Sequence, residues 1–295
     1  MKKILLSLSV VAAVAVVVVG ATTAFFSDTE TSTGNVLAAG AIDLGIDNES
    51  YFNGDPNSGT SWTLDFDLSK DANGDPEAHQ LFNFSDLKPG DFGEDTISIH
   101  VNDNPSWVCA ETTVRTDDDV NCSEPEMAND PLCLEPNGNT TDGDLADEIE
   151  IMWWADDGDN VLEIGEQVLD QGDLGQAPLG FPVTSVLADS LNNIWGDLNG
   201  TDPGEGPLPG ATTKHIAKAW CFGDLSQDAL SPGDYSGPDN PGNADDEDEL
   251  TSEDGGFNCT GASVINNASQ TDSITLDVAF RAVQSRNNPD FECNE

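Results

Sequence analysis

Three carboxylates surround one glycine near the middle of the chain. Residues 155–160 are Ala-Asp-Asp-Gly-Asp-Asn, so Asp156, Asp157 and Asp159 lie on either side of Gly158. Hard cations such as calcium bind oxygen ligands that are clustered in this way. Asp156, Asp157 and Asp159 are therefore candidate ligands of a calcium ion.

The same acids have a second interpretation, as turn formers. An EF-hand is excluded, because with the glycine at the sixth loop position the first, third and twelfth positions hold no carboxylate. The alternative is a β-hairpin, in which strand 148–155 turns at 157–160 into strand 161–169. Both interpretations require a strand that ends just before the acids.

The cysteines and histidines exclude a zinc site of the usual spacing. The three histidines, His79, His100 and His215, are far apart and form no H-E-x-x-H motif, and no two cysteines have C-x-x-C spacing. In an exported chain an even number of cysteines is expected to form disulfides. The candidates are Cys109, Cys122, Cys133, Cys221, Cys259 and Cys293. We expect Cys122 and Cys133 to pair, because they are close together in one loop.

The charge of the chain excludes whole classes of partner. Its 295 residues contain 9 Lys+Arg against 56 Asp+Glu, a formal net charge of -47. Nucleic acid and anionic membrane surfaces would repel such a chain. Acidic runs such as 245–249 are typical of solvated loops in a protein adapted to concentrated salt, where self-repulsion is screened.

The N-terminus has the pattern of a secretory signal peptide. Two lysines precede an apolar run at 4–19, and small residues follow it up to Ala24. We expect cleavage between Ala24 and Phe25, which assigns residues 1–24 to the signal peptide. The apolar run is shorter than the ~20 residues of a membrane span. The mature protein is therefore expected to be secreted or at the cell surface, without a stable membrane anchor.

Two-residue alternation of apolar and polar side chains dominates the rest of the chain and predicts antiparallel strands. It is found at 62–68, 97–101, 149–153 and 274–282, and more weakly at 108–114 and 215–222. Turn-rich loops between such strands favour a sandwich. The fold class predicted is mainly β, an antiparallel jelly-roll-like β-sandwich with at most one or two short helices.

Two acidic stretches are expected to be loop insertions outside the core, at 116–147 and 223–257. Apolar residues at helical spacing predict one helix, at 185–195. The domain organisation expected is a signal peptide, an N-terminal extended segment at 25–40, and one sandwich domain at 41–295 that carries both insertions.

The junction after the signal peptide resembles a known family. Ala-Phe-Phe-Ser-Asp at 24–28, then Gly-Ala-Ile-Asp-Leu at 40–44 and Leu-Lys-Pro-Gly-Asp at 87–91, are similar to the pattern of the TasA and camelysin family, secreted matrix proteins processed by a SipW-type signal peptidase. The insertions at 116–147 and 223–257 and the six cysteines depart from the shorter members, whereas the C-terminal segments 270–273 and 280–288 look like those of larger, cysteine-bearing relatives. The resemblance implies a jelly-roll subunit of extracellular fibres in a biofilm matrix.

In that family the freed N-terminal segment of one subunit completes a sheet of the next. The resemblance implies that Phe25, Phe26, Val36 and Leu37 anchor this donor strand, and that the partners are other copies or paralogues of the chain and a SipW-type signal peptidase. Strand addition to an open sheet edge supplies main-chain hydrogen bonds for affinity and alternate side chains for register. The alternative is that 25–40 is a leader or the first strand of its own domain.

A different class of function competes with the fibre. The chain could be a monomeric, calcium-binding cell-surface adhesin that uses Asp156, Asp157, Asp159 and the 223–257 loop. Camelysin-type relatives are classed as metallopeptidases, which makes that activity a remote alternative, but the chain lacks the histidine pair. We therefore expect no enzyme activity, no catalytic residue, and no cofactor other than calcium.

Overall fold

The computed structural model of the 295-residue chain describes residues 27–32, 43–68, 79–102, 104–122, 125–130, 133, 143–176, 180, 183–196, 206–232, 255–262, 264 and 266–294. Within these ranges no helix is long and apolar enough to cross a membrane.

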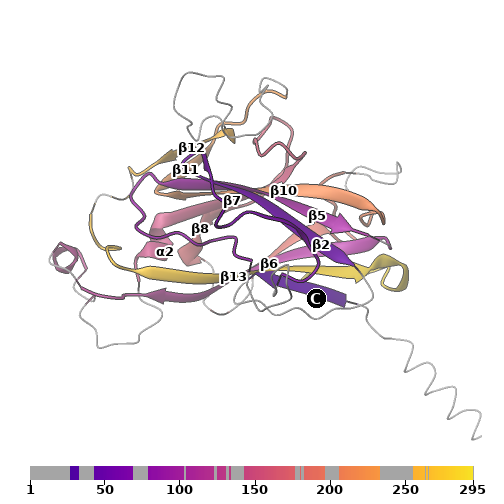
Figure 1. Cartoon of the computed structure of the whole chain (residues 1–295), viewed down its shortest axis with the longest axis horizontal. Helices are drawn as coiled ribbons and strands as arrows, with labels where there is room; N and C mark the ends of the chain where they lie inside the picture. Colours follow the sequence, from indigo (N-terminus) through magenta and orange to yellow (C-terminus); the bar gives the residue numbers. More distant parts are fainter. Residues whose placement is uncertain are drawn as a thin grey trace, which may run out of the picture.

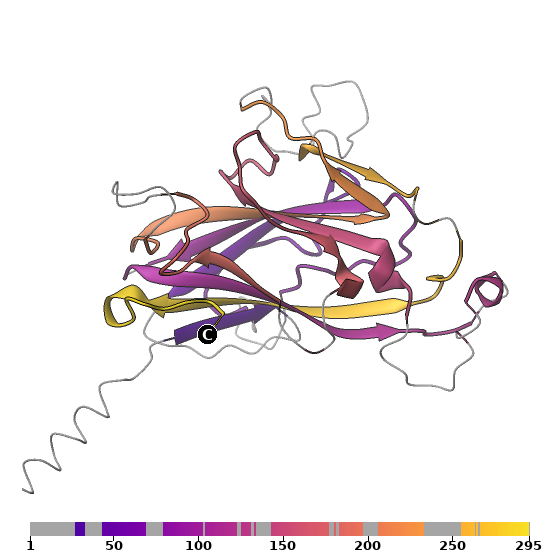
Figure 2. The same cartoon turned by 180° about the vertical axis from the view of Figure 1, so that it is seen from behind.

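Two antiparallel sheets face each other and form a sandwich, which confirms the predicted fold class (Figures 1 and 2). The smaller sheet has the order β1-β13-β6-β9, and its strands are Ser27–Ser32, Ser273–Gln284, Ser106–Asp118 and Val183–Ala188. The larger has the order β3-β2-β5-β10-β7-β8, with β4 also paired to β2. Its strands β2 to β5 are Leu44–Phe52, Asp55–Pro56, Trp62–Asp65 and Phe92–Val101, and β7, β8 and β10 are Ile149–Asp156, Val168–Asp173 and Thr212–Phe222.

The main core lies between the two sheets. The larger sheet contributes the alternating residues Ile97, Ile99 and Val101 of β5, which are fully buried, and β13 contributes Phe280 and Ala282. Alternate side chains of a strand point to the same face, so the two-residue pattern places these residues in one layer. The predicted strands at 97–101, 108–114, 149–153, 215–222 and 274–282 are confirmed.

A second, smaller core covers the other face of the larger sheet. A two-stranded sheet of β11 (Asp224–Gln227) and β12 (Phe257–Thr260) contributes Leu225 and Phe257, which pack with Met152 and Trp154 of β7. Strand β7 is therefore buried on both of its faces. Parts of the stretch 223–257, predicted to lie outside the core, thus supply core residues.

Few of the described residues are helical. Besides three short 3-10 turns, η1 (Glu126–Ala128), η2 (Leu174–Gln176) and η4 (Ser285–Asn287), the described residues contain the four-residue helix α2 (Leu145–Glu148). Leu145 and Ala146 of α2 are buried in the main core, although they belong to the stretch 116–147 that was predicted to be an insertion. That stretch also begins inside β6, which ends at Asp118.

The predicted helix at 185–195 is wrong. Its first residues belong to β9, which pairs with β6, and the chain then turns because Oδ1 of Asp189 accepts the backbone N–H groups of Leu191 and Asn192, each at 2.9 Å. Leu191, expected in the apolar stripe, is 68% exposed. Pairing with a strand distant in sequence outweighs the local helical spacing.

The predicted strand 62–68 is too long. Strand β4 ends at Asp65, and Leu64 and Phe66 are 43% and 40% exposed. The two side chains cover Gly45 of β2, where a Cβ atom would lie only 2.6 Å from the Phe66 ring and 2.7 Å from Leu64 Cδ1. Of the predicted apolar face, Leu68 is buried in the main core and Trp62 packs against it, whereas Leu64 and Phe66 cover the neighbouring glycine.

The predicted hairpin forms with a later second strand. Strands β7 and β8 pair antiparallel, but β8 begins at Val168, so 161–167 is part of the connection. Val161 and Leu162 are buried, and the backbone of Leu162 donates to Gly255 and accepts from Leu230, both at 2.9 Å. Bonds to two distant segments draw these residues away from the hairpin ladder.

All six cysteines are paired, as predicted. Cys122 bonds Cys133 across 11 residues, which confirms the expected pair, while Cys109 bonds Cys293 and Cys221 bonds Cys259. The last two bridges join β6 to the C-terminal segment and β10 to β12. Three disulfides are typical of a protein that folds in an oxidising compartment outside the cytosol.

Candidate functional site

The acidic loop after β7 brings its three candidate ligands together. Asp156 is the last residue of β7, and carboxylate oxygens of Asp156, Asp157 and Asp159 lie within 4.8 Å of one another. Gly158 has φ +113°, in the left-handed region that glycine adopts without strain. Its backbone lies against the ring of His215, which occupies the register position opposite Asp156 on β10.

Asp156 is the buried member of this group. It is 3% exposed, and its Oδ2 accepts the backbone N–H groups of Gly158 at 2.9 Å and Asn160 at 3.4 Å. Its Oδ1 is buried and has no hydrogen-bond partner among the described residues. Burial raises the pKa of Asp156 to about 7, with a smaller contribution from Asp159, because both disfavour the charged carboxylate.

A fourth carboxylate closes the loop on itself. Glu166 accepts the backbone N–H of Asp157 at 3.1 Å through one oxygen and that of Glu163 at 2.9 Å through the other. Burial raises the pKa of Glu166 to about 8, and the neighbouring charge of Asp156 adds to the shift. These bonds tie the end of the loop back to Asp157 and Glu163. Glu166 was not among the predicted ligands.

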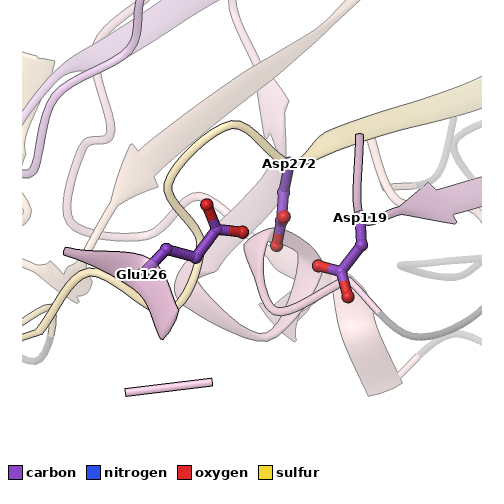
Figure 3. A group of neighbouring side chains, drawn as sticks. All are labelled: Asp119, Glu126 and Asp272. Atoms are coloured by element: carbon purple, nitrogen blue, oxygen red, sulfur yellow. The ribbon is translucent and has the colours of Figure 1, made fainter. Parts of the chain in front are cut away.

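A second carboxylate cluster was missed entirely. Asp119, Glu126 and Asp272 point toward one another, with oxygens within 4.8 Å, although they come from the end of β6, from η1 and from the residue before β13 (Figure 3). Glu126 is fully buried. The signals in sequence were only the disulfide Cys122–Cys133, which closes the loop that carries Glu126, and the acidity of that loop.

Asp272 is the residue that joins this cluster to the sandwich. Its Oδ2 accepts the backbone N–H of Asp144 at 2.7 Å. Burial, with a smaller contribution from a side-chain hydrogen bond with Asp119, raises its pKa to about 8. Both effects favour the protonated form of Asp272 at neutral pH.

A third buried carboxylate has a cation of its own. Asp95 of β5 and Lys218 of β10 are both fully buried, and Nζ of Lys218 lies 2.6 Å from Oδ2 of Asp95. The same ammonium donates to the carbonyl oxygen of Leu81 at 2.9 Å and lies 3.5 Å from the centre of the Phe82 ring. Burial lowers the pKa of Lys218, and Asp95 opposes that shift. Lys218 thereby holds segment 81–82 against the larger sheet.

Among the described residues, one edge of the smaller sheet is covered only in part. Strand β1 pairs antiparallel with β13 from Ser27 opposite Val283 to Ser32 opposite Val278. Among the described strands β1 has no other partner, and residues 273–277 of β13 pair only with β6. These five residues line a groove of about 970 Å³ together with segment 80–87, Trp220 and Phe222.

Several predicted site residues lie outside the described residues. They are Ala24 and Phe25 at the expected cleavage site and the expected anchors Phe26, Val36 and Leu37. The first described segment, Ser27–Ser32, falls between the two pairs of anchors.

Comparison with models of known protein families and with curated proteins found no match for this chain.

Proposed function

We propose that the chain is a secreted structural subunit of extracellular fibres, assembled by donation of the N-terminal strand to a neighbouring copy. The observation that supports it best is the pairing of β1, which lies at the edge of the smaller sheet and has β13 as its one partner among the described strands. An edge strand bound mainly through its ladder can be exchanged between copies at low cost.

The register of β1 supports this role. Continued four and five residues beyond Ser32, the same register would place Val36 opposite Ile274 and Leu37 opposite Ser273. Those positions of β13 border the 970 Å³ groove, which apolar side chains such as Trp220 and Phe222 line. A donor strand that extends past β1 would therefore bring Val36 to the same face as Ile274, which packs against the main core, while Leu37 would point to the opposite face.

The composition of β1 explains why anchors are needed. Its sequence, Ser-Asp-Thr-Glu-Thr-Ser, contains hydroxyl and acidic residues but no apolar side chain. Such a strand supplies ladder hydrogen bonds and little hydrophobic free energy. The apolar pairs that flank it in sequence, Phe25 with Phe26 and Val36 with Leu37, would supply the rest.

Exchange between copies leaves the ladder unchanged. The hydrogen bonds between β1 and β13 are the same whether β1 comes from its own chain or from a neighbour, so the protein concentration decides between the two states. Eleven residues, 33–43, connect β1 to β2, and a chain of that length spans at most about 40 Å. That is sufficient for β1 to reach a subunit in contact.

The test is electron microscopy of the purified mature chain with and without residues 25–37. The truncated chain should stay folded and soluble but form no filaments, because the core strands lie elsewhere. Val36→Pro should weaken filaments by removing one ladder N–H. Val120→Pro, at a 54% exposed position outside the strands, is the matched control and should leave them intact. Filaments of unchanged length from the truncated chain would rule out strand donation.

An engineered disulfide that can be reduced tests the exchange of β1 more directly. Thr31 and Ala279 are register partners, so Thr31→Cys with Ala279→Cys should tie β1 to its own β13 under oxidising conditions. Locked protein should remain monomeric, and mild reductant should restore assembly. The wild-type chain given the same reductant controls for loss of the native disulfides. Filament growth from fully locked protein would contradict exchange of β1.

The second candidate, a monomeric calcium-binding adhesin, is favoured by the grouped oxygens of Asp156, Asp157 and Asp159. It predicts a monomer with an intact N-terminus under all conditions in which the fibre proposal predicts filaments. Neither candidate assigns a catalytic residue.

A further inference from the structure

Loop 156–166, the acidic loop after β7, has a feature that a turn alone does not require. A turn needs aspartate side chains that accept nearby backbone N–H groups, and Oδ2 of Asp156 and Oδ1 of Asp159 do so. Oδ1 of Asp156, however, is buried in a residue that is 3% exposed, and it has no hydrogen-bond partner among the described residues. Buried carboxylate oxygens are costly unless a donor or a cation satisfies them.

Protein cations do not fill this role. Among the described residues no lysine or arginine forms an ion pair with Asp156, Asp157 or Asp159, and the arginine and lysine pairs lie elsewhere. The ring of His215 packs on Gly158 and is not one of the grouped ligands. The negative charge of the loop is thus left to a ligand from solution.

We propose that loop 156–166 binds one hard divalent cation, with Asp156, Asp157 and Asp159 as its carboxylate ligands. Carboxylate oxygens within 4.8 Å of one another match the ligand chemistry of calcium or magnesium rather than that of softer metals. Asp157 is exposed and Asp156 is buried, so the ion would sit at the surface with water completing its shell. The bonds of Glu166 to the backbone of Asp157 and Glu163 hold the loop in shape for it.

The cation would connect the end of β7 to the loop that covers the outer face of the larger sheet. Asp156 ends β7, and Leu162 within the loop packs with Trp154 and Phe257 in the second core. Binding should therefore stabilise the folded chain, independently of whether it forms fibres. At about 100 times its Kd, calcium should raise the Tm by about 5–10 °C.

The experiment is calcium titration of the purified, metal-free full chain, followed by calorimetry and by thermal unfolding. All samples contain sodium chloride at matched ionic strength, because a chain of net charge -47 also attracts cations diffusely. Terbium, a calcium substitute, adds a local readout, since Trp153 and Trp154 directly precede the loop and can sensitise its luminescence. One saturable site per chain is expected.

Three variants test the assignment. Asp157→Asn, at an exposed position, should fold normally and weaken calcium binding at least tenfold, and Asp156→Asn should abolish it. Asp170→Asn, an exposed aspartate of β8 outside the loop, is the matched control and should bind like wild type. No saturable binding by wild type, a preference for zinc over calcium, or equal binding by Asp157→Asn and wild type would each overturn the proposal.

Discussion

Two regions of this protein gather three carboxylates by opposite routes. In loop 156–166 the acids are neighbours in sequence, and backbone N–H groups of the same loop donate to them. In the second cluster Asp119, Glu126 and Asp272 come from three separate segments, and the side-chain bond between Asp272 and Asp119 needs a proton. The first cluster includes an exposed aspartate, Asp157, whereas none of the three carboxylates of the second cluster is exposed.

The difference shows that burial of an acid does not by itself define a cation site. Burial raises the pKa of Asp156 to about 7 and that of Asp272 to about 8, so the two carboxyls are similar in this respect. What distinguishes them is the neighbouring acid: beside Asp156 lies the exposed Asp157, whereas Asp119 makes a side-chain hydrogen bond that favours the protonated form of Asp272. Asp95 is a third case, in which Lys218 supplies the balancing charge from within the chain.

The Asp95–Lys218 pair gives the largest expected effect. Lys218→Met would leave Asp95 buried without its cation, and breaking such a pair typically costs about 3–5 kcal/mol. It would also release the carbonyl of Leu81 from its donor. Denaturant unfolding should show this loss. Lys88→Met, which removes an exposed lysine paired with Asp86, is the control and should leave stability nearly unchanged. Equal effects of the two variants would mean that the buried pair is not a stabilising element.

The disulfide Cys122–Cys133 separates the two acidic clusters experimentally. Replacing both cysteines by serine should cost about 2–3 kcal/mol, because an 11-residue loop regains freedom in the unfolded chain. The loop carries Glu126, so the cluster around Asp272 should loosen. Calcium affinity of loop 156–166 should stay the same, since that loop is built without this disulfide. A parallel loss of calcium affinity would show that the two clusters are coupled.

Two glycines in loop 156–166 allow the cost of backbone strain to be distinguished from that of a side-chain contact. Gly158 and Gly165 both have positive φ, +113° and +115°. A Cβ at Gly158 would lie 3.1 Å from Cδ2 of His215, whereas nothing lies within 4 Å of one at Gly165. Gly165→Ala should therefore cost only the strain, about 1–2 kcal/mol, and Gly158→Ala slightly more. Thermal unfolding without metal compares them, and a smaller cost for Gly158→Ala would contradict the packing against His215.

Much of the fold could be predicted from alternation because the core strands have one consistent inner face. Residues such as Ile97, Ile99 and Val101 of β5 are buried by the sheet opposite. Prediction from alternation failed where the residues that surround a strand are distant from it in the sequence. Strand β9 had helical spacing, yet it pairs with β6, some 70 residues earlier in the chain. Leu64 and Phe66 alternate as core residues do, but they cover Gly45.

The two acidic clusters differ in the same way. Asp156, Asp157 and Asp159 could be identified because their proximity is a property of the sequence. Asp119 and Asp272 are brought together only by the pairing of β6 with β13, whose ladder ends at Asp118 opposite Ser273. No local pattern contains that register, so the cluster could not be predicted without the fold.

The smallest expected effect is the pH dependence that Asp272 contributes. Its folded-state pKa is raised to about 8, while the unfolded chain releases this proton near the ordinary value of 3.8. The native state therefore binds more protons between these values, and its stability should rise as the pH falls from 8 toward 4. Because Asp272 is partly accessible to solvent, we discount the shift and expect about 0.5–1 kcal/mol between pH 8 and pH 5.

Asp272→Asn isolates this contribution from the self-repulsion of a chain with net charge -47, which weakens on acidification as well. The amide cannot ionise, so the variant should show a shallower rise in stability on acidification than wild type. Denaturant midpoints at pH 5 and pH 8, measured at saturating calcium so that loop 156–166 stays loaded, give the comparison. Asp170→Asn, at an exposed position, should keep the wild-type slope. If Asp272→Asn also keeps it, the cluster does not hold a proton at neutral pH, and the contrast between the two acidic regions fails.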